Sequence, residues 1–280
     1  MDEKVAVVTG CSTGIGYETS LLFARSGYHT FATTRNLERA RSLIEVKRKE
    51  RLPLNVFQLD LSDDSSIHTT FSEIERNFGK IDILVNNAGY GLLGSLEDVS
   101  LEEVKEQFEV NLFGTVRLMQ LVIPGMRIRK SGIIVNVSSG AGIVGFPCMS
   151  AYVCTKFALE GISESIAYEL EPLGIKVIIV EPGVIRTQFI KHSIIAKRAS
   201  NEHSPYFYIF QKIYNNLIFM QQLATPPSDV ARVIFNAIND TKTNLRYLVG
   251  NDVAVVAEAK KSLSDAEFRR AMIQQIFQEL

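Results

Sequence analysis

The chain has 280 residues, of which 46% are hydrophobic and 22% are charged, and its formal net charge is -1. This composition indicates a single domain over residues 1–280 with a large apolar core, and it gives no reason to expect a nucleic-acid partner. The acidic N-terminus lacks a signal-peptide pattern, no run approaches the ~20 apolar residues of a transmembrane segment, and the three cysteines and four histidines show no metal-ligand spacing, so we expect a cytoplasmic protein without a metal site.

Short β-branched apolar segments alternate with longer segments of helical period along most of the chain. We expect strands at residues 4–10, 28–34, 54–60, 81–87, 132–138, 175–181 and 246–250, and helices at residues 15–26, 37–49, 63–78, 101–126, 150–170 and 227–239. Several strands are apolar almost throughout, as strands are when helices cover both faces of a sheet. The pattern predicts an α/β fold of the Rossmann type, with a doubly wound, seven-stranded parallel sheet between two helical layers.

The first expected strand runs into the turn TGCSTGIG, where Gly10, Gly14 and Gly16 open a helix. Glycines let a backbone turn tightly and approach a pyrophosphate, whose charge is favoured by free amides and by the positive end of the helix dipole. The spacing G-x-x-x-G-x-G departs from the general dinucleotide pattern G-x-G-x-x-G, so by itself it is a weak signal.

The second expected strand ends at Thr34 and Arg35, where NAD-selective folds place an acidic residue against the ribose 2′-hydroxyl. A guanidinium can instead pair with a 2′-phosphate, so we predict a preference for NADP(H) over NAD(H). The alternative is that Arg35 is only an exposed residue at the start of a helix.

In the segment SAYVCTKFALEG, Tyr152 and Lys156 lie four residues apart and therefore on one face of the expected helix. A cation beside a phenol favours the phenolate, so we expect Lys156 to lower the pKa of Tyr152 towards neutral pH. Such a phenol can exchange protons with a substrate. Because amphipathic helices also contain this pair by chance, the other motifs decide between the two interpretations.

Residues 188–225 break the alternation, since they contain many large apolar side chains but no strand pattern. We expect a substrate lid there, because ligands of parallel sheets bind at the carboxyl ends of the strands. A surface helical hairpin or a subunit contact is the alternative. Residues 251–280 have a helical period and extend the chain further. They either cover the mouth of the pocket or block a contact between subunits.

Four motifs carry a resemblance to a known family. TGCSTGIG, NNAG at residues 86–89, YVCTK at 152–156 and PG at 182–183 occur in this order, and over residues 4 to about 250 the chain resembles the short-chain dehydrogenases/reductases. FATTRNLERA, TKFALEG and RYLVG look most like the branch with 17β-hydroxysteroid and retinol dehydrogenases. The resemblance implies hydride transfer between a nicotinamide and a carbonyl or alcohol carbon, and a homodimer or homotetramer.

The resemblance also implies roles for individual residues. Tyr152 would transfer the proton and Ser139 would bond the substrate oxygen, unless Ser139 only ends a strand. Lys156 would hold the nicotinamide ribose, and Asn111 would hold a water that relays protons, unless it is a satisfied core amide. The residues implied to bind the cofactor are Gly10, Ser12, Thr13, Gly14, Ile15, Gly16, Arg35, Asp60, Leu61, Asn87, Ala88, Gly89, Tyr152, Lys156, Pro182, Gly183, Val184 and Thr187.

Two of these cofactor residues carry open alternatives. Asp60 would contact the adenine edge, but an Asp between a strand and a helix is also a common helix cap. Pro182 and Gly183 would form the turn that passes the nicotinamide carboxamide. Either Thr187 or the backbone of Val184 would bond that carboxamide.

The expected substrate is a hydrophobic ketone, aldehyde or alcohol of steroid, retinoid or lipid type. An apolar lid suits such a ligand, because aromatic walls bury a large ligand area. The candidate wall residues are Phe189, Tyr206, Phe207, Phe210, Tyr214 and Phe219. The alternatives are a 3-oxoacyl-thioester reductase, whose lid is expected to be shorter, and a non-catalytic nucleotide-binding sensor.

Overall fold

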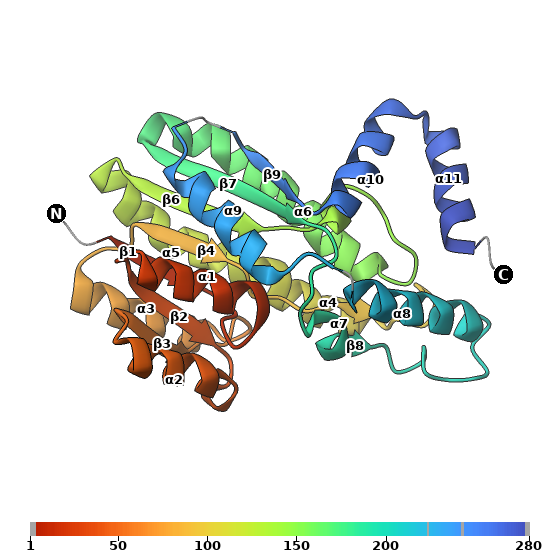
Figure 1. The fold of residues 1–280 in the computed structure, drawn as a ribbon, viewed down its shortest axis with the longest axis horizontal. Coiled ribbons are helices and arrows are strands. Elements are labelled where there is room, and N and C mark those ends of the chain that lie inside the picture. Colours follow the sequence, from red (N-terminus) through yellow and green to blue (C-terminus); the bar gives the residue numbers. More distant parts are fainter. Residues whose placement is uncertain (1–3, 223, 242–243, 278–280) are drawn as a thin grey trace.

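The protein is described from a computed structural model over residues 4–222, 224–241 and 244–277. Its core is a parallel sheet whose strands lie in the order β3-β2-β1-β4-β6-β7-β9 (Figure 1). The strands are β1 (Val5–Val8), β2 (His29–Thr34), β3 (Leu54–Gln58), β4 (Ile83–Asn86), β6 (Gly132–Val137), β7 (Ile175–Pro182) and β9 (Arg246–Val249). The seven-stranded parallel sheet predicted from the alternation is therefore confirmed.

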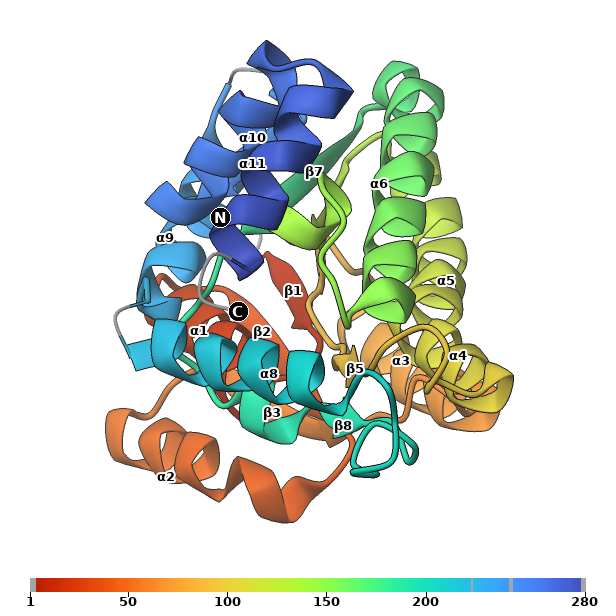
Figure 2. The same cartoon turned by 90° about the vertical axis from the view of Figure 1, so that its right-hand side faces the viewer.

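Helices cover both faces of this sheet, as Figure 2 shows. One layer contains α1 (Gly14–Arg25), α2 (Arg41–Glu50) and α9 (Pro227–Asn239), and the other contains α3 (Asp64–Phe78), α5 (Gly114–Arg129) and α6 (Ser150–Leu170). Strand side chains alternate between the two cores: Ala6 and Val8 pack in the first, and Val5 and Val7 in the second. This double burial explains why the strands read as continuous apolar runs.

The helix expected over residues 101–126 contains a break that its period did not indicate. A capping box of Ser100 and Glu103 opens α4 (Leu101–Phe108), which continues through a π-helical turn, η2 (Glu109–Phe113), into α5. A π turn inserts an extra residue into the hydrogen-bond ladder, and such turns are frequent at functional sites. The inserted turn contains Asn111, one of the four residues with an implied catalytic role.

The segment 188–225 contains α7 (Phe189–His192), β8 (Ile194–Ile195) and α8 (Phe207–Gln222). The expectation that this segment has no strand is wrong, because β8 pairs in parallel with β5 (Leu92–Leu93). The backbone amides of Ile194 and Ala196 donate to the carbonyls of Gly91 and Leu93, each at 2.8 Å. Two residues are too few for a periodic signal, so this strand is set by its partner.

The C-terminal extension forms two helices, α10 (Asn251–Ser262) and α11 (Asp265–Phe277), which follow β9. Both contribute side chains to the cavity at the carboxyl ends of the strands, so the extension lies at the mouth of that cavity. Short helical turns, η1 (Leu37–Ala40), η3 (Gly140–Gly142) and η4 (Glu171–Leu173), complete the elements. Within the described segments, no helix combines the length and the apolar character needed to cross a bilayer.

Candidate active site

A cavity of about 2120 Å³ opens at the carboxyl ends of the central strands. The loops after β1, β2, β3, β4, β6 and β7 line one part of it, and residues of α4, η2, α6, α7, β8, α8, α10 and α11 line other parts. Pockets for drug-sized ligands occupy about 300–1,000 Å³, so this cavity has room for a dinucleotide and a substrate together. In the part of the chain that the structure describes, no three His, Cys, Asp or Glu side chains gather as metal ligands would.

The glycine turn after β1 forms one end of the cavity. Gly10 and Gly14 have φ values of +72° and +65°, a backbone region that L side chains rarely adopt. Gly10 and Gly14 line the cavity together with Ser12, Thr13 and Ile15, at the N-terminus of α1. The helix start is open to an anionic group, because the side chain of its N-cap residue, Thr13, makes no capping hydrogen bond.

Gly16 has a different task from the other two glycines. It lies outside the residues that line the cavity, and a Cβ at this position would collide with the carbonyl oxygen of Gly10 and the side-chain amide of Asn87. Asn87 in turn donates to the carbonyl of Thr9 at 2.8 Å. The glycine at this position therefore keeps the turn packed against the loop after β4.

The loops after β2 and β3 form the end of the cavity expected for the adenosine. Arg35 and Asp60 both line it. Burial acts to raise the pKa of Asp60, but two hydrogen bonds from Ser62 and the nearby Arg35 leave it below its usual value. The cap of α3 is Asp63, which accepts from the amide of Ser65 at 2.9 Å, so the helix-cap alternative for Asp60 is excluded.

Sequence reasoning missed a second guanidinium at this end. Arg39 lies four residues after Arg35, in η1, and it also lines the cavity. Its position in the first turn after the end of β2 was the signal that could have found it.

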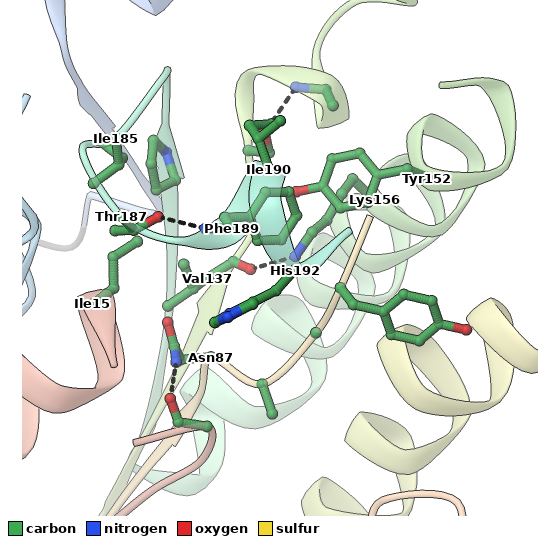
Figure 3. A pocket seen from close by; sticks show the side chains of 18 of the residues that line it. Ile15, Asn87, Val137, Tyr152, Lys156, Ile185, Thr187, Phe189, Ile190 and His192 are labelled. Atoms are coloured by element: carbon green, nitrogen blue, oxygen red, sulfur yellow. Dashed lines mark hydrogen bonds between the residues drawn. The ribbon is translucent and has the colours of Figure 1, made fainter. Parts of the chain in front are cut away.

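Tyr152 and Lys156 lie at the centre of the cavity, and each is 6% exposed. The Nζ atom of Lys156 donates to the carbonyl of Val137 at 2.8 Å and lies 5.8 Å from the centroid of the Tyr152 ring (Figure 3). The helix that carries both, α6, spans the predicted residues 150–170. The spacing thus places both groups beside each other.

The electrostatic outcome differs from the expected one. Burial raises the pKa of Tyr152 to about 12, although a hydrogen bond with Ser139 acts to lower it. Burial also lowers the pKa of Lys156 to about 8, although the charge of Glu160 acts to raise it. Within the protein alone, loss of solvation therefore outweighs the attraction between a phenolate and an ammonium.

Ser139 and Asn111 approach this centre from different sides. The hydroxyl of Ser139 lines the cavity and accepts from the amide of Ala141 at 3.1 Å. Asn111 is 2% exposed and lies outside the lining. Its side chain accepts from the amide of Tyr90 at 3.0 Å and donates to the Tyr90 carbonyl at 2.9 Å and to Thr155 at 3.3 Å. The side chain thereby ties the loop after β4 to the helix of Tyr152.

The turn after β7 is held by a residue that sequence reasoning missed. Asp252, on α10, accepts a hydrogen bond from the backbone amide of Val184 at 2.6 Å. A Cβ on Gly183 would overlap the same carboxylate, so only glycine admits Asp252 this closely. Because the Val184 amide is already bonded, Thr187 is the better placed of the two candidates for a carboxamide. Its oxygen accepts from the amide of Phe189, and its proton can still be donated.

The lid helix α8 both lines the cavity and packs against the protein core. Its cavity-lining residues are Ile213, Asn216, Leu217, Phe219, Met220 and Gln221. Phe210 and Tyr214, in its N-terminal half, pack with Leu217 in an apolar cluster that also contains Tyr152. Of the six aromatic residues expected to form the wall, only Phe189 and Phe219 line it. Tyr206 precedes α8, and Phe207, Phe210 and Tyr214 lie in its N-terminal half, whereas most of the lining residues of α8 follow Tyr214. The composition of the segment did not show this division.

Comparison with known proteins agrees with this geometry. The sequence profile of the short chain dehydrogenases matches residues 4–198. An uncharacterised oxidoreductase of Bacillus subtilis is 36% identical over 262 residues, 90% of this chain and 91% of the relative. Retinol dehydrogenase 8 of Homo sapiens is 36% identical over 87% of this chain and 82% of its own length. Human 17-beta-hydroxysteroid dehydrogenase type 1 is 33% identical over 88% and 77%, respectively.

Solved structures share the fold. A short-chain dehydrogenase from Streptomyces avermitilis is 32% identical, with a TM-score of 0.83 over 98% of this chain and 95% of that one. A metagenomic short-chain oxidoreductase in complex with NADP is 26% identical, with a TM-score of 0.71 over 88% and 96%. A protein from Burkholderia phymatum in complex with NAD is 23% identical, with a TM-score of 0.83 over 96% and 95%, a likeness of fold alone. Similar structures therefore occur with either nicotinamide cofactor.

Proposed function

Because the chain belongs to the short-chain dehydrogenase family, we propose that it is an NADP(H)-dependent oxidoreductase that interconverts hydrophobic ketones or aldehydes with their alcohols. One observation carries this proposal. Tyr152, Lys156 and Ser139 lie in a single cavity, between a glycine turn suited to a dinucleotide and a lid with an apolar lining. The proposed binding and catalytic residues are those implied by the sequence motifs, with Gly16 and Asn111 acting from outside the lining.

Tyr152, Ser139 and Lys156 each have a distinct role in the proposed reaction. When bound, the nicotinamide supplies or accepts the hydride. In the reducing direction, the neutral Tyr152 hydroxyl donates its proton to the substrate oxygen, and Ser139 donates a hydrogen bond to the same oxygen. A phenol with a raised pKa is in the protonated form that this step needs. Lys156 holds a positive charge beside the phenolate that is left behind.

The preference for NADP(H) rests on the adenosine end of the cavity. Arg35 and Arg39 place two guanidinium groups on its lining, where a 2′-phosphate would find charge-assisted hydrogen bonds. Fluorescence titrations with NADPH and NADH test this. Arg35→Ala should weaken NADPH binding by about tenfold to a hundredfold and leave NADH binding unchanged. Arg48→Ala, at the exposed end of α2, is the matched control. Equal or tighter binding of NADH by the wild type would overturn the preference.

The substrate class rests on the lid and on the C-terminal helices. Beside Tyr152, the lining is formed by Phe146, Met149, Phe189, Ile190, Leu217 and Met220, and α10 and α11 add Val253, Val256 and Met272. A mainly apolar lining favours bulky apolar ligands. The curated relatives named retinol dehydrogenase 8 and 17-beta-hydroxysteroid dehydrogenase type 1 point in the same direction.

The first experiment is an absorbance assay of NADPH oxidation with apolar ketones, aldehydes and acyl-thioesters. Wild-type protein should turn over the apolar carbonyls, and Tyr152→Phe should lower kcat by about 10²–10⁴-fold with NADPH binding retained. Faster turnover of acyl-thioesters would favour a 3-oxoacyl-thioester reductase. Tight NADPH binding without turnover of any substrate would favour a nucleotide-binding sensor.

We also propose that the protein works as a homodimer or homotetramer in the cytoplasm. Large apolar side chains that lie open on adjoining elements, Leu101 on α4, Phe113 on η2 and Phe157 on α6, support a self-association surface, since they are 62%, 47% and 46% exposed. The three free cysteines are consistent with a reducing compartment. Sedimentation velocity should give a mass of two or four chains, and a single-chain mass at micromolar concentration would contradict the assembly.

A further inference from the structure

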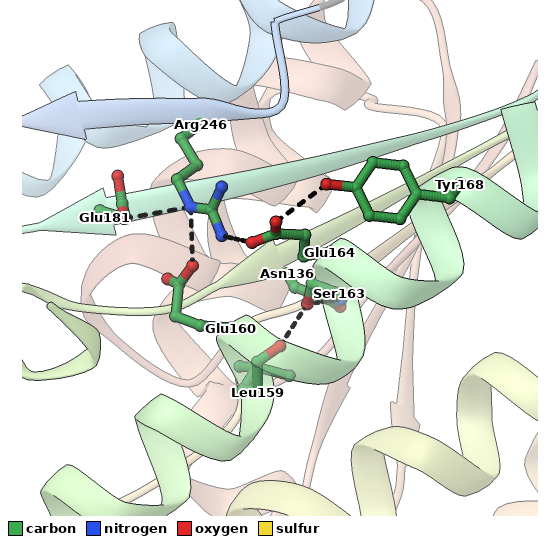
Figure 4. Close-up of polar contacts among 8 residues, drawn as sticks. All are labelled: Asn136, Leu159, Glu160, Ser163, Glu164, Tyr168, Glu181 and Arg246. Carbon is green, nitrogen blue, oxygen red and sulfur yellow. Dashed lines mark hydrogen bonds and ion pairs between the residues drawn. The ribbon is translucent and has the colours of Figure 1, made fainter.

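Three carboxylates lie around one guanidinium in a cluster that begins one helical turn after Lys156 on α6 (Figure 4). Glu160 and Glu164 belong to α6, Glu181 to β7, and Arg246 to β9. Arg246 lies 3.1 Å from Glu160, 2.6 Å from Glu164 and 3.8 Å from Glu181. These four residues come from three elements that only the sheet order brings together.

Within this cluster, Glu160 is the carboxylate nearest to the catalytic centre along α6. It follows Lys156 by four residues, so the two side chains lie on the same face of the helix one turn apart. The residue is 8% exposed. Its Oε2 atom meets Arg246, and among the described residues its Oε1 atom has no hydrogen-bond partner. Only one oxygen of this buried carboxylate is therefore compensated by the guanidinium.

Glu160 also lies close to the loop that carries Ser139. A Cβ on Gly142 would lie 3.2 Å from Glu160 Oε1 and 2.6 Å from the hydroxyl of Ser138, the residue before Ser139. Gly142 thus leaves room for the carboxylate beside the loop that carries Ser139. This position is distinct from that of Glu164, which lies one turn further along α6 and whose side chain is 42% exposed.

The net charge of the cluster is negative, since three carboxylates surround one guanidinium. Burial raises the pKa of Glu181 to about 7, and the charge of Glu160 acts in the same direction. The buried ammonium of Lys156 donates a hydrogen bond to the carbonyl of Val137. The negative charge of Glu160 favours the charged form of this ammonium, and so acts to raise the pKa of Lys156. Glu160 therefore compensates part of the solvation that Lys156 loses.

Other elements packed against α6 bring few competing charges. Glu109 of η2 pairs with Arg117 at 2.6 Å, Glu103 of α4 accepts from the amides of Ser100 and Lys197, and Lys176 of β7 donates to the carbonyls of Ala237 and Asp240. The short elements η3 and β5 consist of uncharged residues, and η4 carries Glu171 at the far end of α6 from Lys156. On the cavity side, Tyr152 and His192 of α7 line the same cavity as Lys156.

We propose that Glu160 is a positioning residue for the reaction: held by Arg246, its carboxylate keeps Lys156 in the ammonium form one helical turn away, and thereby sets the pH range of Tyr152. This inference rests on the proposed function, because it assigns the task of Lys156 to that reaction. It requires no contact between Glu160 and the substrate or the cofactor.

The pH profile of kcat/KM for reduction of an apolar ketone at saturating NADPH tests the proposal. The reducing direction needs the protonated Tyr152 and Lys156 pair, so activity falls as pH rises through the apparent pKa of that pair. In Glu160→Gln a nearby negative charge is lost, which favours the deprotonated pair, so this alkaline limb should move to lower pH by about one unit. Glu164→Gln, which loses a contact with the same Arg246, is the matched control and should leave the limb in place.

A second measurement follows Lys156 without turnover. In protein with ¹⁵Nζ-labelled lysine, the resonance lost in Lys156→Met identifies the group, and its titration should move below that of the wild type in Glu160→Gln but not in Glu164→Gln. If this shift occurs while no substrate is turned over, the positioning role stands and the proposed function fails. An unchanged titration of Lys156 in folded Glu160→Gln, or equal shifts in both variants, would overturn the positioning role.

A third variant covers the case in which Glu160→Gln does not fold, because it leaves Arg246 short of a buried partner. In Glu160→Gln/Arg246→Gln two amides replace the ion pair, which removes that imbalance. Glu160 lies on α6 one turn from Lys156, whereas Arg246 reaches this region from β9, so loss of the carboxylate should outweigh loss of the guanidinium. The titration of Lys156 should therefore move in the same direction by a smaller amount. A titration that does not move, or that moves to higher pH, would overturn the proposal.

Discussion

Replacement of Asp252 by alanine should weaken NADPH binding by about tenfold. The carboxylate lies on α10, 68 residues from Val184 in the chain, and accepts the Val184 amide at 2.6 Å. A hydrogen bond to a charged group contributes about 1.5–3 kcal/mol, and partial exposure of Asp252 places this one at the lower end. Because 1.4 kcal/mol corresponds to a factor of ten, the loss of the turn that follows β7 should appear directly in the dissociation constant.

The assay is a fluorescence titration of NADPH, with thermal unfolding measured on the same samples. Asp252→Asn is the matched control, since its side-chain oxygen keeps an acceptor for the Val184 amide without the charge. It should bind NADPH within about threefold of the wild type, because a neutral hydrogen bond retains about half of the charge-assisted one. Unchanged or tighter binding by a folded Asp252→Ala would refute the reasoning. Unchanged binding would mean that this hydrogen bond does not hold the turn, and tighter binding would mean that Asp252 competes with the carboxamide for the Val184 amide.

Three further predictions concern stability and packing. Burial, with the charge of Glu160, raises the pKa of Glu181 from 4.5 to about 7, so the folded state binds more protons than the unfolded state in this window and stability falls as pH rises through it. Glu181→Gln should abolish this fall. Measured by urea unfolding, its free energy of unfolding relative to the wild type should be about 2 kcal/mol higher at pH 8 than at pH 5. Parallel pH profiles of the two proteins would contradict this. Gly16→Ala should lower the free energy of unfolding by about 2 kcal/mol and weaken NADPH binding, because the new Cβ would overlap the Gly10 carbonyl. Wild-type values in both measurements would show that the turn can relax. Phe210→Ala removes a ring that is 2% exposed and should lower the unfolding free energy by about 3 kcal/mol, whereas a change below about 1 kcal/mol would show that α8 packs independently of the core.

Much of the fold can be predicted from patterns of apolar residues over short stretches of the chain. The alternation of apolar runs and helical periods predicts the strands and the two layers of helices, because a strand buried on both faces must be apolar on both. The helix over residues 150–170 has the predicted bounds, and a period of 3.6 residues is enough to bring Lys156 beside Tyr152. Glycines in the first turn mark positive φ values at Gly10 and Gly14 before any fold is known.

Contacts between distant segments lie beyond such patterns. Asp252 contacts Val184, Arg246 contacts Glu160 across 86 residues, and β8 pairs with β5, because the fold brings together strands, helices and turns that are far apart in the chain. The inserted turn at Asn111 is likewise absent from the periodicity, since one extra residue does not change which side chains are apolar.

Burial explains why the pKa values of Tyr152 and Lys156 in the structure differ from those expected from the sequence. From spacing alone, Lys156 should lower the pKa of Tyr152, because two adjacent positions on a helix face predict an attraction. The structure adds that both groups lie almost completely out of water, which raises the pKa of the phenol and lowers that of the ammonium. Sequence determines which groups are neighbours along a helix. The tertiary structure alone decides how much solvent each group loses, and the free energy of that loss sets the charge that each one carries.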